Sequence, residues 1–397
     1  MRTWQATALS DLLDAQPGFA CGEDPADGVF QFRMNNITSE GRLDFSKKRR
    51  VPKRTRNLDH FLLRPGDVLF NATNSPELVG KSGFFPGYDE PAVFSNHFLR
   101  LRPQAEMLDG RFLARWLVLQ FQRGIFQGMC RQWVNQAAVN RDSLMRLRIP
   151  VPPLPEQRRI AEVLDRAEAL RATRRAALAQ LDALTQSIFI DMFGDPATNP
   201  KAWPLKRLGD CCTGVIDCPH STPVYSTGRT PYPCVRSSDI QKGTLDFADA
   251  KYVDRSEYDK RIARGKPTRG DVIYCREGAR FGNAARVIDD TLLCLGQRMM
   301  LFRPNPTVAV SEYIWAFISS PAGYRQAARS VDGSAAPHVN IREIVAFRIP
   351  APPPALQRDF AGRVAAVEKL KATHRASLAE FDALFASLQH RAFMSEV

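Results

Sequence analysis

Three cysteines and one histidine lie close together in the middle of the chain, at Cys211, Cys212, Cys218 and His220. Thiolate and imidazole groups are the ligands that a structural zinc ion prefers. The spacing, however, lacks the paired Cys-x-x-Cys knuckles of structural zinc sites. We therefore expect no metal here and interpret the 8 scattered cysteines of the chain as reduced thiols, as is typical of a cytoplasmic protein.

A second stretch, Ser75–Ser82, resembles the end of a phosphate-binding loop because it closes on Gly-Lys-Ser. The first glycine of that motif is replaced by Ser75, and Gly83 and Pro86 follow where its helix should begin. We interpret this stretch as a plain loop. The chain also lacks an adenine-methyltransferase signature, a convincing nuclease carboxylate cluster, a His-Glu-x-x-His helix and a nucleophile elbow. The absence of these motifs argues against catalysis by this chain.

Positive charge is the strongest compositional signal. Lysine and arginine outnumber aspartate and glutamate by 55 to 42, a net charge of +13, which favours a nucleic-acid partner. The densest block is Lys47–Arg56, and we expect Lys48, Arg49 and Arg50 in it to contact DNA phosphates. A solvated loop and a nuclear-import signal are the alternatives for this block.

Reading bases requires forked donors and amides near loops or strand ends. Residues of these types are the candidate base contacts, although any one of them could equally be a structural or surface polar residue. In the first half of the chain they are Arg33, Asn35, Asn36, Asn74, Asn96, His97, Arg131 and Gln132. In the second half they are Arg236, Ser238, Arg276, Arg280, Asn283, Gln297, Arg298 and His338.

The elements that would position these residues occur twice, at a period of about 200 residues. Ile149–Pro153 returns as Ile349–Pro353, and about 20 of 45 positions are identical from there to the end of the repeat. Upstream, Gly66-Asp67-Val68 returns as Gly270-Asp271-Val272, but the residues between such anchors differ almost completely. We predict two copies of one fold that share a scaffold, diverge in their loops and recognise different targets.

Each copy is expected to begin with short strands, such as 67–70 and 271–274, followed by short apolar helices near 111–121 and 311–319. Proline-rich stops at Pro150–Pro155 and Pro350–Pro354 then precede long helices at about 155–192 and 355–393. Apolar heptad seams predict that these helices pair antiparallel. The seams are Leu164, Ala167, Leu178, Leu181 and Ile188, and Val364, Val367, Leu378, Phe381, Phe385 and Leu388.

Polar residues interrupt both seams, at Arg171 and Arg174 in one helix and at Lys371 and His374 in the other. They either fix the register of the pair or mark where it opens. The expected fold class is α+β, with two mixed α/β domains separated by two long antiparallel, coiled-coil-like helices and related by a pseudo-two-fold repeat. The expected segments are a domain at 1–152, a helix at 153–194, a domain at 195–352 and a helix at 353–397.

The segment Ile149–Ile160 resembles the Ile-Pro-x-Pro-Pro-Leu-x-Glu-Gln-x-x-Ile start of the spacer helix in type I restriction specificity subunits. The second copy keeps the proline pairs and Gln357-Arg358 but departs at Ala355 and Leu356. Met192–Pro196 and Trp203-Pro204-Leu205 are similar to the family's join between the helix and the next domain.

This resemblance implies a non-catalytic subunit whose two target-recognition domains read the halves of a bipartite, asymmetric site in double-stranded DNA. It implies docking of two methyltransferase subunits on the helices, and of motor–nuclease subunits beyond them. S-adenosylmethionine and ATP are expected in those partners, and no cofactor or membrane contact in this chain. A stand-alone nuclease and a DNA-binding module of another defence or regulatory complex are the alternatives.

Overall fold

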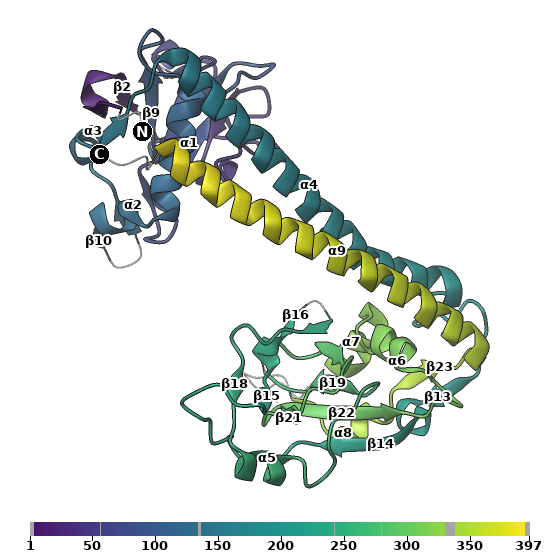
Figure 1. The fold of residues 1–397 in the computed structure, drawn as a ribbon. Coiled ribbons are helices and arrows are strands. Elements are labelled where there is room, and N and C mark those ends of the chain that lie inside the picture. Colours follow the sequence, from purple (N-terminus) through teal and green to yellow (C-terminus); the bar gives the residue numbers. More distant parts are fainter. Residues whose placement is uncertain are drawn as a thin grey trace. The chain divides into compact units, whose positions relative to one another are not determined.

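The computed structural model describes residues 4–55, 57–133, 136–241, 243–278, 280–329 and 338–393 (Figure 1). The chain divides into two compact units. Unit 1 comprises Met1–Thr173 and Leu378–Val397, and unit 2 comprises Arg174–Ser377. Two helices of 40 residues each, α4 (Leu154–Phe193) and α9 (Pro354–Phe393), contribute one half to each unit. None of the helices in this described part combines the length and apolar character needed to cross a bilayer.

Unit 1 is built on a four-stranded antiparallel sheet covered by helix α1 (Gly110–Gln122), whose Phe112 shares a core with Phe70 and Leu101 of the sheet. Across the sheet the strands are β2 (Leu13–Pro17), β9 (Phe98–Pro103), β5 (Val68–Asn71) and β7 (Ser82–Phe84). A second sheet holds β4 (Arg50–Val51), β3 (Val29–Phe32) and β8 (Ala92–Phe94), and a third holds β10 (Arg131–Trp133), β11 (Gln136–Ala138) and β6 (Thr73–Asn74). Strand β1 (Ala6–Ala8) pairs with β12 (Arg148–Pro150), and short helices α2 (Ile125–Met129) and α3 (Arg141–Met145) complete the unit.

Unit 2 repeats the four-stranded sheet, the second sheet and the pairing of its first and last strands, which confirms the predicted duplication. Among the described residues, the third sheet of unit 1 is not repeated, and unit 2 has instead a pair of β16 (Ile240–Gln241) and β17 (Thr244–Leu245). Its four-stranded sheet has the order β14 (Cys212–Asp217), β22 (Met299–Pro304), β19 (Val272–Cys275) and β20 (Ala284–Arg286). Its second sheet holds β18 (Lys251–Tyr252), β15 (Pro233–Val235) and β21 (Cys294–Leu295), and β13 (Leu205–Arg207) pairs with β23 (Arg348–Pro350). Helices α6 (Ser311–Ile318), α7 (Pro321–Arg329) and α8 (Ile341–Ile344) match α1, α2 and α3, while α5 (Arg255–Arg261) takes the place of a short 3-10 helix, Leu58–Phe61, in unit 1.

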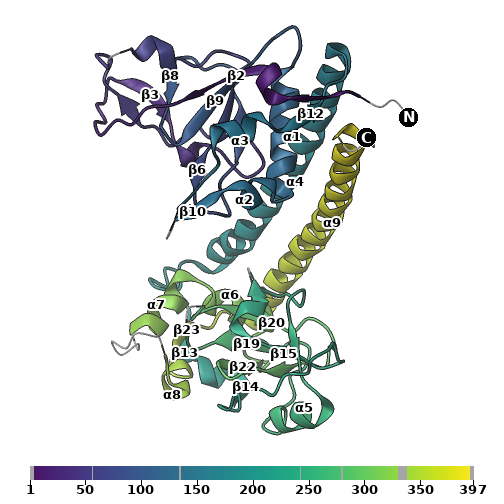
Figure 2. The same cartoon turned by 90° about the vertical axis from the view of Figure 1, so that its left-hand side faces the viewer.

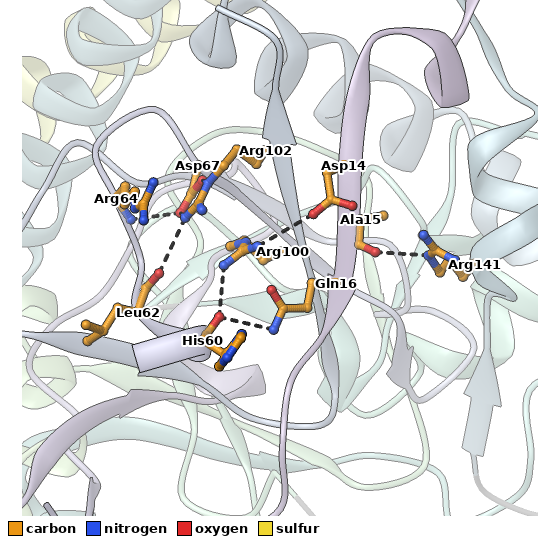
Figure 3. Close-up of polar contacts among 10 residues, drawn as sticks. All are labelled: Asp14, Ala15, Gln16, His60, Leu62, Arg64, Asp67, Arg100, Arg102 and Arg141. Carbon is orange, nitrogen blue, oxygen red and sulfur yellow. Dashed lines mark hydrogen bonds and ion pairs between the residues drawn. The ribbon is translucent and has the colours of Figure 1, made fainter. Parts of the chain in front are cut away.

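The repeated Gly-Asp pair before the central strand forms a turn in each unit. Gly66 has a φ of 100°, a conformation that glycine adopts without steric cost. Asp67 closes the turn by accepting the backbone N–H of Arg64 at 2.8 Å and two donors of Arg102, both at 2.7 Å (Figure 3). The repeat therefore preserves a buried ion pair that fixes the start of β5. Unit 2 has the same arrangement in Gly270, Asp271, Thr268 and Arg303.

A buried glutamine fastens the start of each long helix. The Gln157 side chain is fully buried, and its Oε1 accepts the backbone N–H of Asp109 at 2.8 Å. Its Nε2 donates to the carbonyls of Met107 and Pro152 at 2.9 and 2.8 Å. Since Asp109 is the N-cap of α1, this one side chain joins α1, the proline-rich stop and α4. In unit 2, Gln357 makes the equivalent contacts with Val310, Val308 and Pro352.

Inside each unit, one half of α4 packs antiparallel against one half of α9. Leu164 of α4 and Phe385 of α9 share the core of unit 1, and Phe189 of α4 and Val364 of α9 share a core of unit 2. Figure 2 shows α1 beside the first half of α4, where Arg115 donates to Asp165 at 2.7 Å. The long helices are thus continuous with the cores of both units. This pairing confirms the antiparallel prediction.

The polar interruptions of the seams form ion clusters at equivalent positions in the two units. In unit 1, Arg171 contacts Glu168 at 2.5 Å and Asp382 at 2.6 Å, and its guanidinium lies 4.3 Å from the centre of the Phe385 ring. In unit 2, the ammonium of Lys371 lies 2.8 Å from Glu368 and 2.9 Å from Asp182, and Arg174 meets His374 at 3.0 Å. The helices therefore remain in contact at these positions and do not open.

Candidate nucleic-acid interface

In unit 1, several candidate base contacts gather where β5 ends and β9 begins. The Asn71 side chain donates to the carbonyl of His97 at 3.2 Å and accepts from Asn74 at 2.6 Å. Asn74 belongs to β6, which pairs with β11, and β11 pairs with the strand that carries Arg131. The exposed Asn96 lies in the turn directly before His97. Residues from three separate parts of the sequence therefore meet at this edge of the unit, which we call the polar edge.

His97 is half-buried at the polar edge and has a lowered pKa. Burial is the main cause, and the positive charge of Arg33 lowers the pKa further. The imidazole is therefore neutral at pH 7, with one donor and one acceptor nitrogen. Arg33 and Asn35, both exposed, come from the turn that follows β3. The polar edge of unit 1 thus presents neutral hydrogen-bonding groups together with the exposed arginines Arg33 and Arg131.

Unit 2 places different side chains on the equivalent edge. The backbone N–H of Arg276 donates to the carbonyl of Arg298 at 3.2 Å, as the N–H of Ala72 does to the carbonyl of His97 at 2.9 Å in unit 1. Arg298 therefore occupies the position of His97, and Gln297 that of Asn96. A forked cation replaces a neutral imidazole, so the two edges differ in the bases that they could recognise.

Glu277 organises the polar edge of unit 2. Its Oε1 lies 3.5 Å from Nε of Arg298, and its Oε2 lies 2.8 Å from Nδ1 of His338. A pocket of about 260 Å³ opens beside these residues. It is lined by Tyr225, Arg236, Ser237, Ser238, Gly296, Gln297, Arg298 and Met299. Sequence reasoning missed Glu277 because a search for donors to base edges passes over an acidic residue.

Two of the candidate base contacts have internal roles instead. Arg276 is 3% exposed, and its guanidinium lies 3.1 Å from His220 Nδ1 and 3.5 Å from Asp217 Oδ1. Asn36 is fully buried and accepts the backbone N–H of Arg33 at 2.8 Å. We therefore leave both out of the proposed set of DNA contacts.

The other candidates of unit 2 differ in how freely they could reach DNA. Arg236 is held by Asp239 at 2.7 Å, whereas Ser238, Arg280, Asn283 and His338 are exposed. The side chain of Gln132 lies outside the described residues.

The basic run Lys47–Arg56 is partly neutralised by acidic neighbours. Arg50 forks onto Glu90 at 2.6 and 2.9 Å, and Lys48 lies 3.5 Å from the same carboxylate. Arg49 donates to the carbonyl of Cys21 at 2.7 Å, so its side chain holds the loop together. The exposed cations of the run are Lys47, Lys48, Lys53 and Arg54, while Arg56 lies outside the described residues. Contact between this run and DNA phosphates remains a prediction, carried by these exposed side chains.

The cysteines around position 211 lie in different parts of the fold and do not form one cluster. Cys211 lies in the core under β14 and α6, whereas Cys218 belongs to a different core cluster. Burial raises the pKa of both thiols to about 11 and that of Cys212 to about 12. His220 is engaged with Asp217 at 2.9 Å. Within the described ranges, no three histidine, cysteine, aspartate or glutamate side chains converge as metal ligands would.

The Ser75–Ser82 stretch forms the connection between β6 and β7, as the plain-loop interpretation predicted. Lys81, the residue that would face a phosphate, is 7% exposed and points into the unit. Its ammonium donates to the carbonyls of Ile37 at 2.8 Å and Met34 at 3.1 Å, and burial lowers its pKa. This lysine therefore holds two loops together.

Four exposed leucines on the long helices were not identified by the seam pattern. Leu170 and Leu384 belong to unit 1 and are 52% and 49% exposed; Leu184 and Leu370 belong to unit 2 and are 40% and 51% exposed. Each pair flanks the ion cluster of its own unit, because Leu170 precedes Arg171 and Leu370 precedes Lys371. The signal that could have found them is the repetition of apolar residues off the seam at the 200-residue period.

Sequence comparison finds known proteins that are similar to parts of this chain. Residues 1–182 match the family model described as type I restriction modification DNA specificity domain. The type I restriction enzyme MjaX specificity subunit of Methanocaldococcus jannaschii is 25% identical over 209 residues, which cover 52% of this chain and 49% of that protein. The StySPI specificity subunit of Salmonella potsdam is 26% identical over 203 residues, covering 48% and 42%. The matched segments thus span less than half the length of these relatives.

Solved structures extend the likeness over the whole fold. The crystal structure of the type I restriction–modification S subunit from M. genitalium has a TM-score of 0.59 at 14% identity, covering 100% of this chain and 97% of that one. A chain from a structure of the assembly and conformational transition of a type I system has a TM-score of 0.55 at 19% identity, covering 99% and 98%. At these identities the comparison establishes the shared fold.

Proposed function

We propose that this chain is a specificity subunit of a type I restriction–modification system, as its matches to such proteins support, and that its two units read the two halves of one bipartite, asymmetric DNA site. A specificity subunit recognises DNA sequence and performs no catalysis. Methyl transfer and cleavage, with S-adenosylmethionine and ATP, would reside in methyltransferase and motor–nuclease subunits that act with this chain in the cytoplasm.

One observation carries the proposal of two half-sites. The strand order of the four-stranded sheet is the same in both units, and so are the aspartate–arginine pair and the buried glutamine. At the polar edge, by contrast, Asn96 and His97 correspond to Gln297 and Arg298. Sequence is read through side-chain donors and acceptors. A shared scaffold with different groups at the same place is therefore suited to reading two different sequences.

The exposed leucines support the proposal of two methyltransferase subunits. Exposed apolar side chains that recur together are typical of protein interfaces. Leu170 with Leu384 and Leu184 with Leu370 are equivalent pairs, one in each unit. Equivalent surfaces on a duplicated chain would bind two copies of the same partner.

The test of modular reading exchanges one unit. Residues 1–150 are replaced by the corresponding segment of a relative that recognises another sequence, and the chimera is co-expressed with its methyltransferase partner. Methylome sequencing of the host should show a change in one half of the methylated site and no change in the other. A change in both halves would refute independent reading, and methyl transfer or DNA cleavage by the isolated chain would contradict its assignment as non-catalytic.

A further inference from the structure

We propose that Arg298 reads a guanine in the half-site recognised by unit 2, through a forked contact in the major groove, with Glu277 as its positioning residue. This inference rests on the proposed function and assigns one recognition contact to one side chain. Arginine is the residue best suited to guanine, because its parallel N–H groups match the O6 and N7 acceptors of that base.

The backbone places Arg298 at the tip of the polar edge. Residues 296–298 form the short turn between β21 and β22, and the turn is held from two sides. The N–H of Gly296 donates to the carbonyl of Val235 at 2.8 Å, and the carbonyl of Arg298 accepts from the N–H of Arg276 at 3.2 Å. A side chain on a turn anchored to two sheets is presented with little backbone freedom, which recognition of a base requires.

The side chain of Arg298 is half exposed and leaves its fork available. It is 50% exposed, and its closest charged neighbour, Glu277, faces the Nε atom at 3.5 Å. In the described part of the chain no hydrogen bond engages its two terminal nitrogens. Glu277 is itself held by His338 at 2.8 Å. The carboxylate therefore orients the guanidinium through its Nε atom, and the two terminal nitrogens remain available to donate hydrogen bonds to a ligand.

Two other arginines among the candidate base contacts of unit 2, Arg276 and Arg236, are differently engaged. Arg276 is 3% exposed within a cluster that includes His220 and Asp217. Arg236 is bidentate to Asp239 at 3.1 and 2.7 Å and also donates to the carbonyl of Asp249 at 2.6 Å. Of the three arginines, Arg298 is the one whose fork is available to a base. The adjoining pocket of about 260 Å³, lined by serines and Gln297, leaves room for an incoming base edge.

The experiment uses the full chain in complex with its methyltransferase partner. A duplex library with randomised positions first defines the preferred site of the wild type and of Arg298→Ala. The variant should lose its preference for guanine at one position in one half-site and keep every other preference. At that position, binding of the preferred duplex should fall on the order of 5- to 150-fold, the range of a bidentate base contact.

A base analogue then tests whether the N7 atom of the guanine is contacted. Replacing that guanine by 7-deazaguanine removes the N7 acceptor, so it should weaken wild-type binding and have no further effect on Arg298→Ala. Arg298→Lys, which keeps the charge but not the planar fork, should retain at most part of the preference for guanine. Glu277→Gln should lower discrimination at the same position only. Arg269→Ala is the matched control, because Arg269 is exposed at the opposite end of strand β19.

The outcomes separate this inference from the proposed function. If Arg298→Ala weakens binding to all duplexes alike and lowers the salt dependence by about one unit of slope, the residue contacts phosphate and the guanine assignment is wrong. An additive effect of 7-deazaguanine in the variant would also overturn the assignment. If the wild-type complex selects no sequence from the library, the proposed function itself fails.

Discussion

At the scale of single residues, the duplicated positions are those that hold the scaffold together. Gln157 and Gln357 are fully buried, and each satisfies one backbone N–H and two carbonyls. A buried polar group that loses its partner costs more free energy than a single hydrogen bond contributes. This asymmetry accounts for the presence of the same amide at the same place in both units.

We predict that Gln157→Ala lowers the free energy of unfolding of unit 1 by about 2–4 kcal/mol, because it leaves three buried backbone groups without their partner. Urea unfolding of the full chain, followed by tryptophan fluorescence, to which Trp4 and Trp116 of unit 1 contribute, would measure the change. Arg158→Ala is the matched control, since Arg158 is the next residue and its side chain is 60% exposed. The control should change stability by less than about 0.5 kcal/mol. Equal effects of the two variants would show that the glutamine is not the fastening group.

At the scale of elements, the long helices depend on charges buried inside their seams. The side chain of Lys371 is 4% exposed, with its ammonium between Asp182 and Glu368, and Arg171 occupies the equivalent place in unit 1. Removing one partner of a buried ion pair leaves an uncompensated charge, which is costly even where the intact pair contributes little. The clusters therefore make a wrong register of the two helices unfavourable.

Lys371→Met is expected to destabilise unit 2 by about 3–5 kcal/mol, because Asp182 and Glu368 lose their shared cation. Denaturant unfolding would measure the loss. The double variant Lys371→Met with Asp182→Leu should recover part of it, since it also removes one of the two carboxylates that face the lysine. Lys369→Met, on the same helix, provides the control. If the single variant is as stable as the control, the ion cluster does not hold the register.

A second prediction at this scale concerns docking. Leu170→Glu with Leu384→Glu should remove one of two methyltransferase subunits from the complex, because charge on an apolar contact opposes its burial. Native mass spectrometry should show one methyltransferase subunit per chain in place of two, and the equivalent pair Leu184 and Leu370 should give the same result. Val224→Glu, at a residue 68% exposed away from the helices, should leave two subunits bound. Full occupancy in the leucine variants would place docking elsewhere.

At the scale of the whole molecule, each long helix contributes one half to each unit, so we propose that the helix pair sets the unread gap between half-sites. Inserting one heptad near Ala177 and one near Ser377 preserves both seams. It adds about 10 Å of helix, or roughly three base pairs. Methylome sequencing should then show the same two half-sites with a longer gap. Four residues inserted in one helix alone should break the seam and abolish methylation. If the gap between the half-sites stays unchanged while binding remains tight, the helix pair does not set the spacing.

The sequence by itself determined the architecture of this protein. The repeat at 200 residues, the proline stops and the heptad seams predicted two copies of one fold and a pair of long helices, and the structure has helices at Leu154–Phe193 and Pro354–Phe393. Such features are visible in one dimension because proline restricts the local backbone and a helix repeats every 3.6 residues. Each acts over a few neighbouring residues, so no distant contact is needed to recognise it.

Only the tertiary structure decided which polar side chains are available to DNA. Arg276 and Arg298 are both arginines at the ends of strands, yet the first is 3% exposed and the second 50%. The difference comes from Asp217, His220 and His338, which lie 56 to 62 residues from Arg276 along the chain and surround its guanidinium. Burial and hydrogen-bond partners are properties of the folded chain, because residues far apart in sequence supply them.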